Sequence, residues 1–161
     1  MRIDLSVIRP GSKAFGIPEL HCAEFGLFST GRILYLENHT IDWSKPVFVP
    51  CALDDRHGVH RAVAADFRDI GKLDIVAVSY LLPGFFPDRK HRDLDATVYL
   101  EQTAPGQFVR HSLETVTCDH VTCAAGDVFG TGKVDLVTGN FVYDPTADKA
   151  VTIWKNLGRP K

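Results

Sequence analysis

The hydrophobic pattern of this chain has a period of two rather than 3.6, which is the spacing of a β-strand with one buried face. The segments 73–80 and 97–102 are rich in β-branched and aromatic residues and are bounded by Gly, Pro and Asp. No window shows the period of an amphipathic helix of ordinary length. The pattern therefore predicts an all-β fold.

The chain contains an internal repeat. Residues 64–77 align with residues 125–138 at a constant offset of 61. The identical pairs include Asp66/Asp127, Gly71/Gly132, Lys72/Lys133 and Asp74/Asp135. A second element, 34–38, recurs at 98–102 and more loosely at 151–156. Because two elements recur in the same order, we interpret the chain as a tandem repeat.

One full unit of the repeat predicts four short strands joined by turns. The strands are expected at about 61–66, 73–79, 96–102 and 107–114. The connections are expected at 67–72, 80–95 and 103–106, the last with a Pro-Gly turn signal. Four antiparallel strands that recur about every 60 residues are typical of propeller blades rather than of a sandwich. We therefore expect a partial β-propeller of two to three four-stranded antiparallel blades.

The repeat divides the chain unequally. Residues 61–115 are expected to form a complete blade, 33–60 the last strands of one blade, and 116–161 an incomplete following blade. Residues 1–32 fit the repeat poorly, although 22–26 hints at a decayed copy. Closed propellers have about four to eight blades. The chain is therefore expected to be a piece of a larger propeller, or a protomer that self-associates through its open sheet edges.

The repeated segments 65–76 and 126–137 resemble FG-GAP/VCBS repeats, which build the propellers of integrin α-subunits and occur in many bacterial secreted and surface proteins. The second copy retains the Phe129–Gly130 pair of the family name, and the resemblance spans about residues 33–157. It implies a β-propeller, secreted or at the cell surface, that serves adhesion or binding. It also implies Ca²⁺ in the loop between the first two strands of each blade.

The calcium loop of that family places carboxylates at alternate positions, because the hard cation Ca²⁺ takes about six to eight oxygen ligands. Four of these carboxylates remain, namely Asp66, Asp74, Asp127 and Asp135. The middle ligand positions hold other residues, namely Arg68, Ile70, Phe129 and Thr131. We therefore expect the remaining Asp residues to cap their turns by accepting backbone N–H bonds, and the calcium sites to be weak and unoccupied.

Propeller geometry predicts a binding face. Connections between blades, and those between second and third strands, would emerge together on the face opposite the calcium loops. These connections are 54–60, 81–95, 117–120 and 140–149. Long loops on a rigid scaffold concentrate binding residues, so we expect a protein or small ligand to bind there. The candidate residues are His57, His60, Arg89, Lys90, His91, Cys118, Asp119 and His120.

Cys118, His120 and Cys123 raise two further hypotheses. With His57 or His60 from a neighbouring blade they would form a Cys/His zinc site. Cysteines five positions apart on a strand face opposite sides, however, and the spacing is not the paired C-x-x-C of zinc modules. Alternatively, a cysteine beside His120 would be the activated thiolate of a thiol-dependent enzyme. We favour buried thiols over both, because cysteines in such a cluster most often belong to the core. No G-x-S-x-G, P-loop or H-E-x-x-H motif that would indicate catalysis is present.

Charge and hydropathy narrow the choice of partners. The chain has 18 basic and 20 acidic residues and a net charge of −2, so no basic field favours nucleic acid. No apolar run approaches the ~18 residues of a membrane helix. The first ten residues carry charges where a signal peptide needs an apolar run. Localisation is therefore left open, because the family resemblance implies export and the N-terminal sequence shows no export signal.

Overall fold

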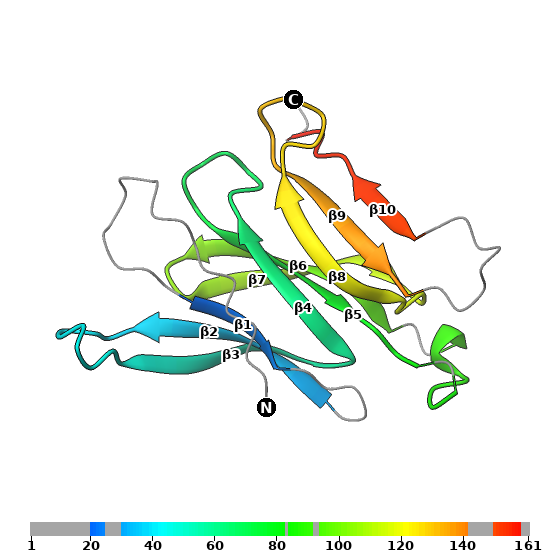
Figure 1. Cartoon of the computed structure of the whole chain (residues 1–161), viewed down its shortest axis with the longest axis horizontal. Helices are drawn as coiled ribbons and strands as arrows, with labels where there is room; N and C mark the ends of the chain where they lie inside the picture. Colours follow the sequence, from blue (N-terminus) through cyan, green and yellow to red (C-terminus); the bar gives the residue numbers. More distant parts are fainter. Residues whose placement is uncertain (1–19, 25–29, 83, 92–93, 142–149, 159–161) are drawn as a thin grey trace.

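The computed structural model describes residues 20–24, 30–82, 84–91, 94–141 and 150–158. In these ranges the chain is all-β, with ten strands and one short 3₁₀ helix, as the hydrophobic period predicts. The strands form three antiparallel sheets, and none of these sheets closes on itself (Figure 1).

Each sheet is a meander in which strands adjacent in sequence are hydrogen-bonded neighbours. The first sheet contains β1 (Leu20–Glu24), β2 (Thr30–Asn38) and β3 (Phe48–His57). The middle sheet contains β4 (Val59–Ala65), β5 (Asp74–Ser79), β6 (Asp95–Ala104) and β7 (Gln107–Thr115). The third sheet contains β8 (His120–Gly126), β9 (Asp135–Asn140) and β10 (Val151–Trp154). The 3₁₀ helix, Arg89–His91, lies between β5 and β6.

The four strands expected within residues 61–115 are β4 to β7, and they pair in the expected order. The Pro105–Gly106 signal lies at the β6–β7 turn, where Gly106 has a φ of +69°. β1 was not expected, because the segment 1–32 does not show the repeat pattern. Its five residues nevertheless pair with β2 from Leu20↔Leu36 to Glu24↔Arg32.

The middle sheet lies between the other two sheets (Figure 1), and all six residues of β5 are buried. Successive side chains of a strand point to opposite faces. Ile75 and Ala77 accordingly pack in one core with Ile33 of the first sheet. Val76 and Val78 pack in another core with Cys123 and Leu136 of the third sheet. The first strands of the sheets are also in contact, β1 with β4 and β4 with β8.

Candidate functional site

The two loops that resemble calcium loops, β4–β5 and β8–β9, have the same pattern of internal hydrogen bonds. The carboxylates of Asp66 and Asp127 each accept bonds from the backbone N–H groups four and five residues further on. The N···O distances are 3.1 and 2.6 Å for Asp66, and 2.8 Å for both bonds of Asp127. Gly71 and Gly132 donate the second bond at a φ of +75° and +76°, which glycine adopts without strain. These carboxylates therefore cap their turns, as the sequence predicts.

The second repeated carboxylates, Asp74 and Asp135, are buried and link each loop to the third strand of its sheet. Oδ1 of Asp74 accepts the backbone N–H of Gln102 at 2.9 Å, and Oδ1 of Asp135 accepts that of Asn156 at 2.8 Å. The bond from Asn156 is the main cause that lowers the pKa of Asp135. The repeat thus preserves one structural contact at equivalent places in two sheets.

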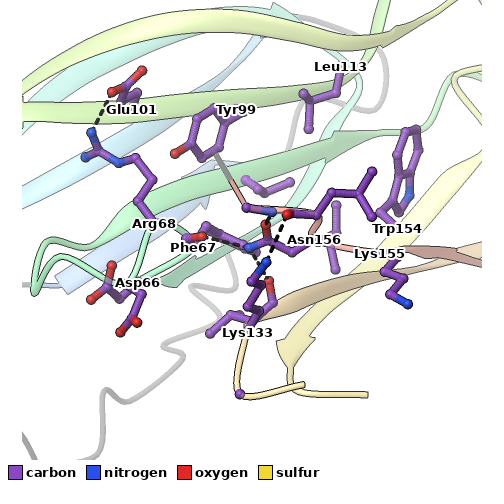
Figure 2. A pocket seen from close by; sticks show the side chains of 17 residues that line it. Asp66, Phe67, Arg68, Tyr99, Glu101, Leu113, Lys133, Trp154, Lys155 and Asn156 are labelled. Atoms are coloured by element: carbon purple, nitrogen blue, oxygen red, sulfur yellow. Dashed lines mark hydrogen bonds and ion pairs between the residues drawn. The ribbon is translucent and has the colours of Figure 1, made fainter. Parts of the chain in front are cut away.

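A cleft of about 1160 Å³ lies between the middle and third sheets, on the side of these loops. Its apolar lining comes from both sheets and includes Val76, Tyr99, Leu113, Leu136 and Trp154. Its charged lining includes Asp66, Arg68, Glu101, Lys133 and Lys155. Figure 2 shows Tyr99 and Leu113 in the upper part of the view, next to Glu101, with Trp154 at the right and Asp66 and Lys133 in the lower part. The cleft thus offers apolar contact area beside charged groups.

One residue, Asn156, holds the base of the cleft together. Its side-chain Nδ2 donates to the carbonyl oxygens of Phe67, in the β4–β5 loop, at 2.7 Å and of Val134 at 3.0 Å (Figure 2). The bond to Phe67 spans from the third sheet to the middle sheet. The side-chain amide of Asn156 therefore bridges the third sheet and the loop of the middle sheet where the cleft begins.

The polar groups of the cleft are largely paired. Tyr99 donates its hydroxyl to Oδ2 of Asp74 at 2.6 Å, and burial, followed by this bond, raises the pKa of Tyr99. Glu101 bonds Nη1 of Arg68 at 2.5 Å and Nε2 of His111 at 3.1 Å. Such pairing leaves the cleft without a strongly acidic or basic wall. It is suited to a ligand held by apolar and backbone contacts rather than by charge.

Parts of the connections expected to form a binding face meet at the opposite end of the sheets. Residues 54–60 are the end of β3 and the start of β4 rather than a long loop, and 83, 92–93 and 142–149 lie outside the described residues. The backbone N–H of Leu81 donates to the carbonyl oxygen of Cys118, and that of Phe141 donates to Asp119, both at 2.8 Å. Arg89 is buried there, with Nη1 donating to Leu81 at 2.5 Å and Nη2 pairing with Asp119 at 2.8 Å. Arg89 thus fastens the β5–β6 connection to the β7–β8 connection.

Of the other residues expected on that face, His120 is also buried. Its Nδ1 lies 2.5 Å from Oδ1 of Asn140 and its Nε2 lies 2.5 Å from Oε2 of Glu114, so it joins β7, β8 and β9. The remaining expected residues divide by exposure: His57, His60 and His91 are exposed, Asp119 is half-buried, and the side chain of Lys90 lies outside the described residues.

The two thiols lie in different cores. Cys118 packs with Leu81 and Ala96, whereas Cys123 packs with residues between the middle and third sheets. Burial raises the pKa of Cys118 to about 11 and that of Cys123 to about 12. A protonated thiol is a poor nucleophile. Within the described part of the chain, no three His, Cys, Asp or Glu side chains are grouped to hold a metal ion.

A scan against protein-family models, a search of curated proteins and a search of solved structures found no match to this chain. The resemblance to FG-GAP/VCBS repeats therefore rests on the residues that carry it and stays a prediction. Among the described residues, no helix has the length and apolar character needed to cross a membrane.

The sequence interpretation did not identify the cleft. The hydrophobic pattern and the repeat do not single out Tyr99, Leu113, Trp154 or Asn156 as residues of a cleft. One signal was present, because the segment 151–156 is a third copy of the 98–102 element. In the complete unit, the 98–102 element is followed by a fourth strand. The copy at 151–156 therefore indicates that a fourth strand is expected beside it in the third sheet.

Proposed function

We propose that this chain is a non-catalytic binding module of the β-propeller type, in which the three sheets are consecutive blades. Three observations support this order. Each sheet is an antiparallel meander, β4 contacts both β1 and β8, and an apolar core lies between the first and middle sheets and between the middle and third sheets. These are features expected when blades are arranged around an axis with one edge of each sheet innermost.

The main support for the proposed binding function is that the outer edge of β10 has no paired strand in the described ranges. In the third sheet Trp154 pairs with Leu136, and in the middle sheet Leu100 pairs with Ile75, one repeat earlier. β10 therefore corresponds to β6. β6 has a further neighbour, β7, whereas no strand in the described ranges pairs with the outer edge of β10. Within the described ranges, the place that β7 fills in the middle sheet is therefore not occupied in the third sheet.

The open edge presents hydrogen-bonding groups. The backbone N–H of Asn140 donates to the carbonyl oxygen of Ala150 at 2.8 Å, which fixes the alternation of bonds between β9 and β10. Val151 and Ile153 consequently direct their backbone N–H and C=O groups away from β9. An extended peptide of a protein partner is the occupant that satisfies such an edge, because strand addition pairs backbone with backbone. The cleft beside the edge would receive its side chains.

The chain itself contains a template for this peptide. Phe108 of β7 packs against Tyr35 of the first sheet, with ring centroids 6.0 Å apart. Tyr99 occupies the place of Tyr35 in the next copy of the repeat and lines the cleft. A peptide that adds to β10 as β7 adds to β6 would therefore place an aromatic residue against Tyr99. Aromatic pairs of this kind contribute about 0.5–1.5 kcal/mol beyond their buried area.

Titration of the chain with a fluorescent peptide of residues 107–115 tests the proposal. We expect saturable binding, and a peptide with Phe108→Ala should bind about tenfold more weakly, because it loses the aromatic anchor. In the chain, Leu113→Glu should weaken binding as well, because Leu113 is 44% exposed and lines the cleft. Ile41→Glu is the matched control, since Ile41 is 99% exposed on the β2–β3 loop.

Equal affinity of the two peptides, or binding that Leu113→Glu leaves intact, would contradict the cleft as the site. Absence of saturable binding would contradict strand addition altogether. In that event the exposed histidines at the other end of the sheets would be the next surface to examine.

A further inference from the structure

The side of the third sheet that faces away from the middle sheet carries exposed apolar side chains. We call this surface the far face of the third sheet. Its apolar residues are the exposed Ala124, Val128, Val151 and Ile153 and the half-buried Val137, and the exposed Thr122 lies on the same face. Val151 is 58% exposed, and Val128 and Ile153 are each 48% exposed. Because Trp154 and Leu136 point into the core with the middle sheet, the alternation of side chains directs Val137 and Ile153 outward.

Equivalent side chains of the middle sheet are covered. At the offset of 61, Ala124, Val128 and Val137 correspond to Val63, Phe67 and Val76. In the alignment of 98–102 with the third copy, Ile153 corresponds to Tyr99. Val63, Phe67, Val76 and Tyr99 all pack in the core against the third sheet. The far face of the third sheet therefore repeats a surface that elsewhere in the chain receives another sheet.

The first sheet carries the matching surface on its own far side. Ile33 and Tyr35 of β2 are buried toward the middle sheet, so their neighbours Leu34 and Leu36 point away from it. Cross-strand partners share a face. The apolar part of the far face of the first sheet therefore consists of Leu34, Leu36, Phe48, Pro50 and Ala52, and Arg32, Asn38 and Asp55 lie on the same face.

This surface also has a covered equivalent. Leu34 and Leu36 correspond to Val98 and Leu100 in the repeat. Phe48 lies opposite Asn38 as Phe108 lies opposite Gln102. Val98, Leu100 and Phe108 pack in the core between the first and middle sheets. The far face of the first sheet thus repeats the surface that, in the middle sheet, packs onto the preceding sheet.

We propose that a second copy of this chain packs the far face of its first sheet onto the far face of the third sheet. The contact continues an arrangement that the chain already makes twice, first sheet to middle sheet and middle sheet to third sheet. It rests on the blade order of the proposed function. The contact is head-to-tail, and two copies that each make it once with the other form a closed ring of six sheets. Closed propellers have about four to eight.

Light scattering coupled to size-exclusion chromatography tests this contact on the 161-residue chain. We expect a mass of twice 17.8 kDa at micromolar concentration. Ala124→Glu on the third sheet and Ala52→Glu on the first sheet should each give monomers, because each buries a charge in the contact. Both alanines are exposed, so the circular dichroism spectrum of each variant should match that of the wild-type chain. Ile41→Glu, on an exposed loop, should leave the dimer intact.

Mixing the two monomeric variants tests the head-to-tail geometry. The Ala52→Glu copy keeps an intact third sheet and the Ala124→Glu copy keeps an intact first sheet, so the mixture should form a heterodimer through one contact. A monomeric wild-type chain would overturn the proposal and favour a following repeat as the occupant. A dimer that survives Ala124→Glu, or a mixture that stays monomeric, would overturn it as well.

The two proposals fail separately. Ala124→Glu lies on β8 and should leave binding of the 107–115 peptide unchanged, whereas Leu113→Glu should lose the peptide and keep the dimer. If Ala124→Glu lost the peptide and kept the dimer, and Leu113→Glu lost the dimer and kept the peptide, both the peptide site and the dimer contact would be contradicted.

Discussion

Arg68 and Asp74 are joined by two parallel hydrogen bonds, Nε to Oδ2 at 2.9 Å and Nη2 to Oδ1 at 2.8 Å. The same guanidinium bonds Glu101 of β6 at 2.5 Å. One repeat later Phe129 holds the place of Arg68 and Lys155 that of Glu101, and Nζ of Lys155 lies 5.1 Å from the centroid of the Phe129 ring. Both sheets therefore join loop to third strand at the same two positions, by an ion pair in one and by a cation–π contact in the other.

Arg68→Met should destabilise the chain markedly. Asp74 is fully buried, and loss of the guanidinium leaves its carboxylate without its counter-charge, which costs about 3 kcal/mol. Phe129→Met is the matched variant in the other loop. Its cost should be below about 1 kcal/mol, because Phe129 is half exposed. Denaturant unfolding of both variants measures the difference, and equal losses would contradict the pairing as described.

Neither loop is expected to respond to Ca²⁺. The carboxylates of Asp66 and Asp127 already accept backbone N–H groups, and Asp74 is bonded by Arg68. A calcium ion would have to replace these bonds with few charged ligands in return. We expect no heat in calorimetric titration with millimolar Ca²⁺ and no rise in Tm. A micromolar calorimetric signal would contradict the capping role.

Acid should weaken the chain partly through Asp135. Hydrogen bonds from the backbone, first that of Asn156, lower the pKa of this carboxyl below its usual value. Stability from a lowered pKa is present above the unfolded value of about 4 and is lost as pH falls toward the folded pKa. The difference in unfolding free energy between wild type and Asp135→Asn should therefore shrink below about pH 4. A difference that is constant from neutral to acid pH would contradict this role.

The buried cysteines should be inert to alkylation. Because burial raises the pKa of Cys118 to about 11 and of Cys123 to about 12, both thiols are protonated and shielded at neutral pH. Cys51 is exposed and should react with iodoacetamide first among these three, as peptide mass mapping would show. In denaturant all three should react. Rapid native labelling of Cys118 or Cys123 would support a thiol-dependent enzyme instead.

The sequence predicted the strands of the middle sheet well, because their signals are local. The alternation in 73–79 and the turn at Pro105–Gly106 depend only on neighbouring residues. The capping of the loops by Asp66 and Asp127 was also predictable, since each carboxylate bonds an N–H group within five residues.

Arg89 and His120 show which features the local sequence does not predict. Arg89 and His120 have polar side chains that are most often exposed, and they were expected on a binding face. Their partners come from distant segments, for example Cys118, whose carbonyl oxygen lies 3.3 Å from Nη1 of Arg89. Such pairing is a property of the assembled sheets. The cleft is harder still to predict. It exists because, in the described ranges, β10 has a strand neighbour on one side only, whereas β6 has one on each side.

Amide hydrogen exchange tests strand addition most directly. The N–H groups of Val151 and Ile153 should exchange rapidly in the free chain, because they point away from β9. Addition of the 107–115 peptide should slow both markedly, while the Phe108→Ala peptide at the same concentration should slow them less. Unchanged exchange at both residues under saturating peptide, or protection confined to the other end of the sheets, would contradict the proposed site.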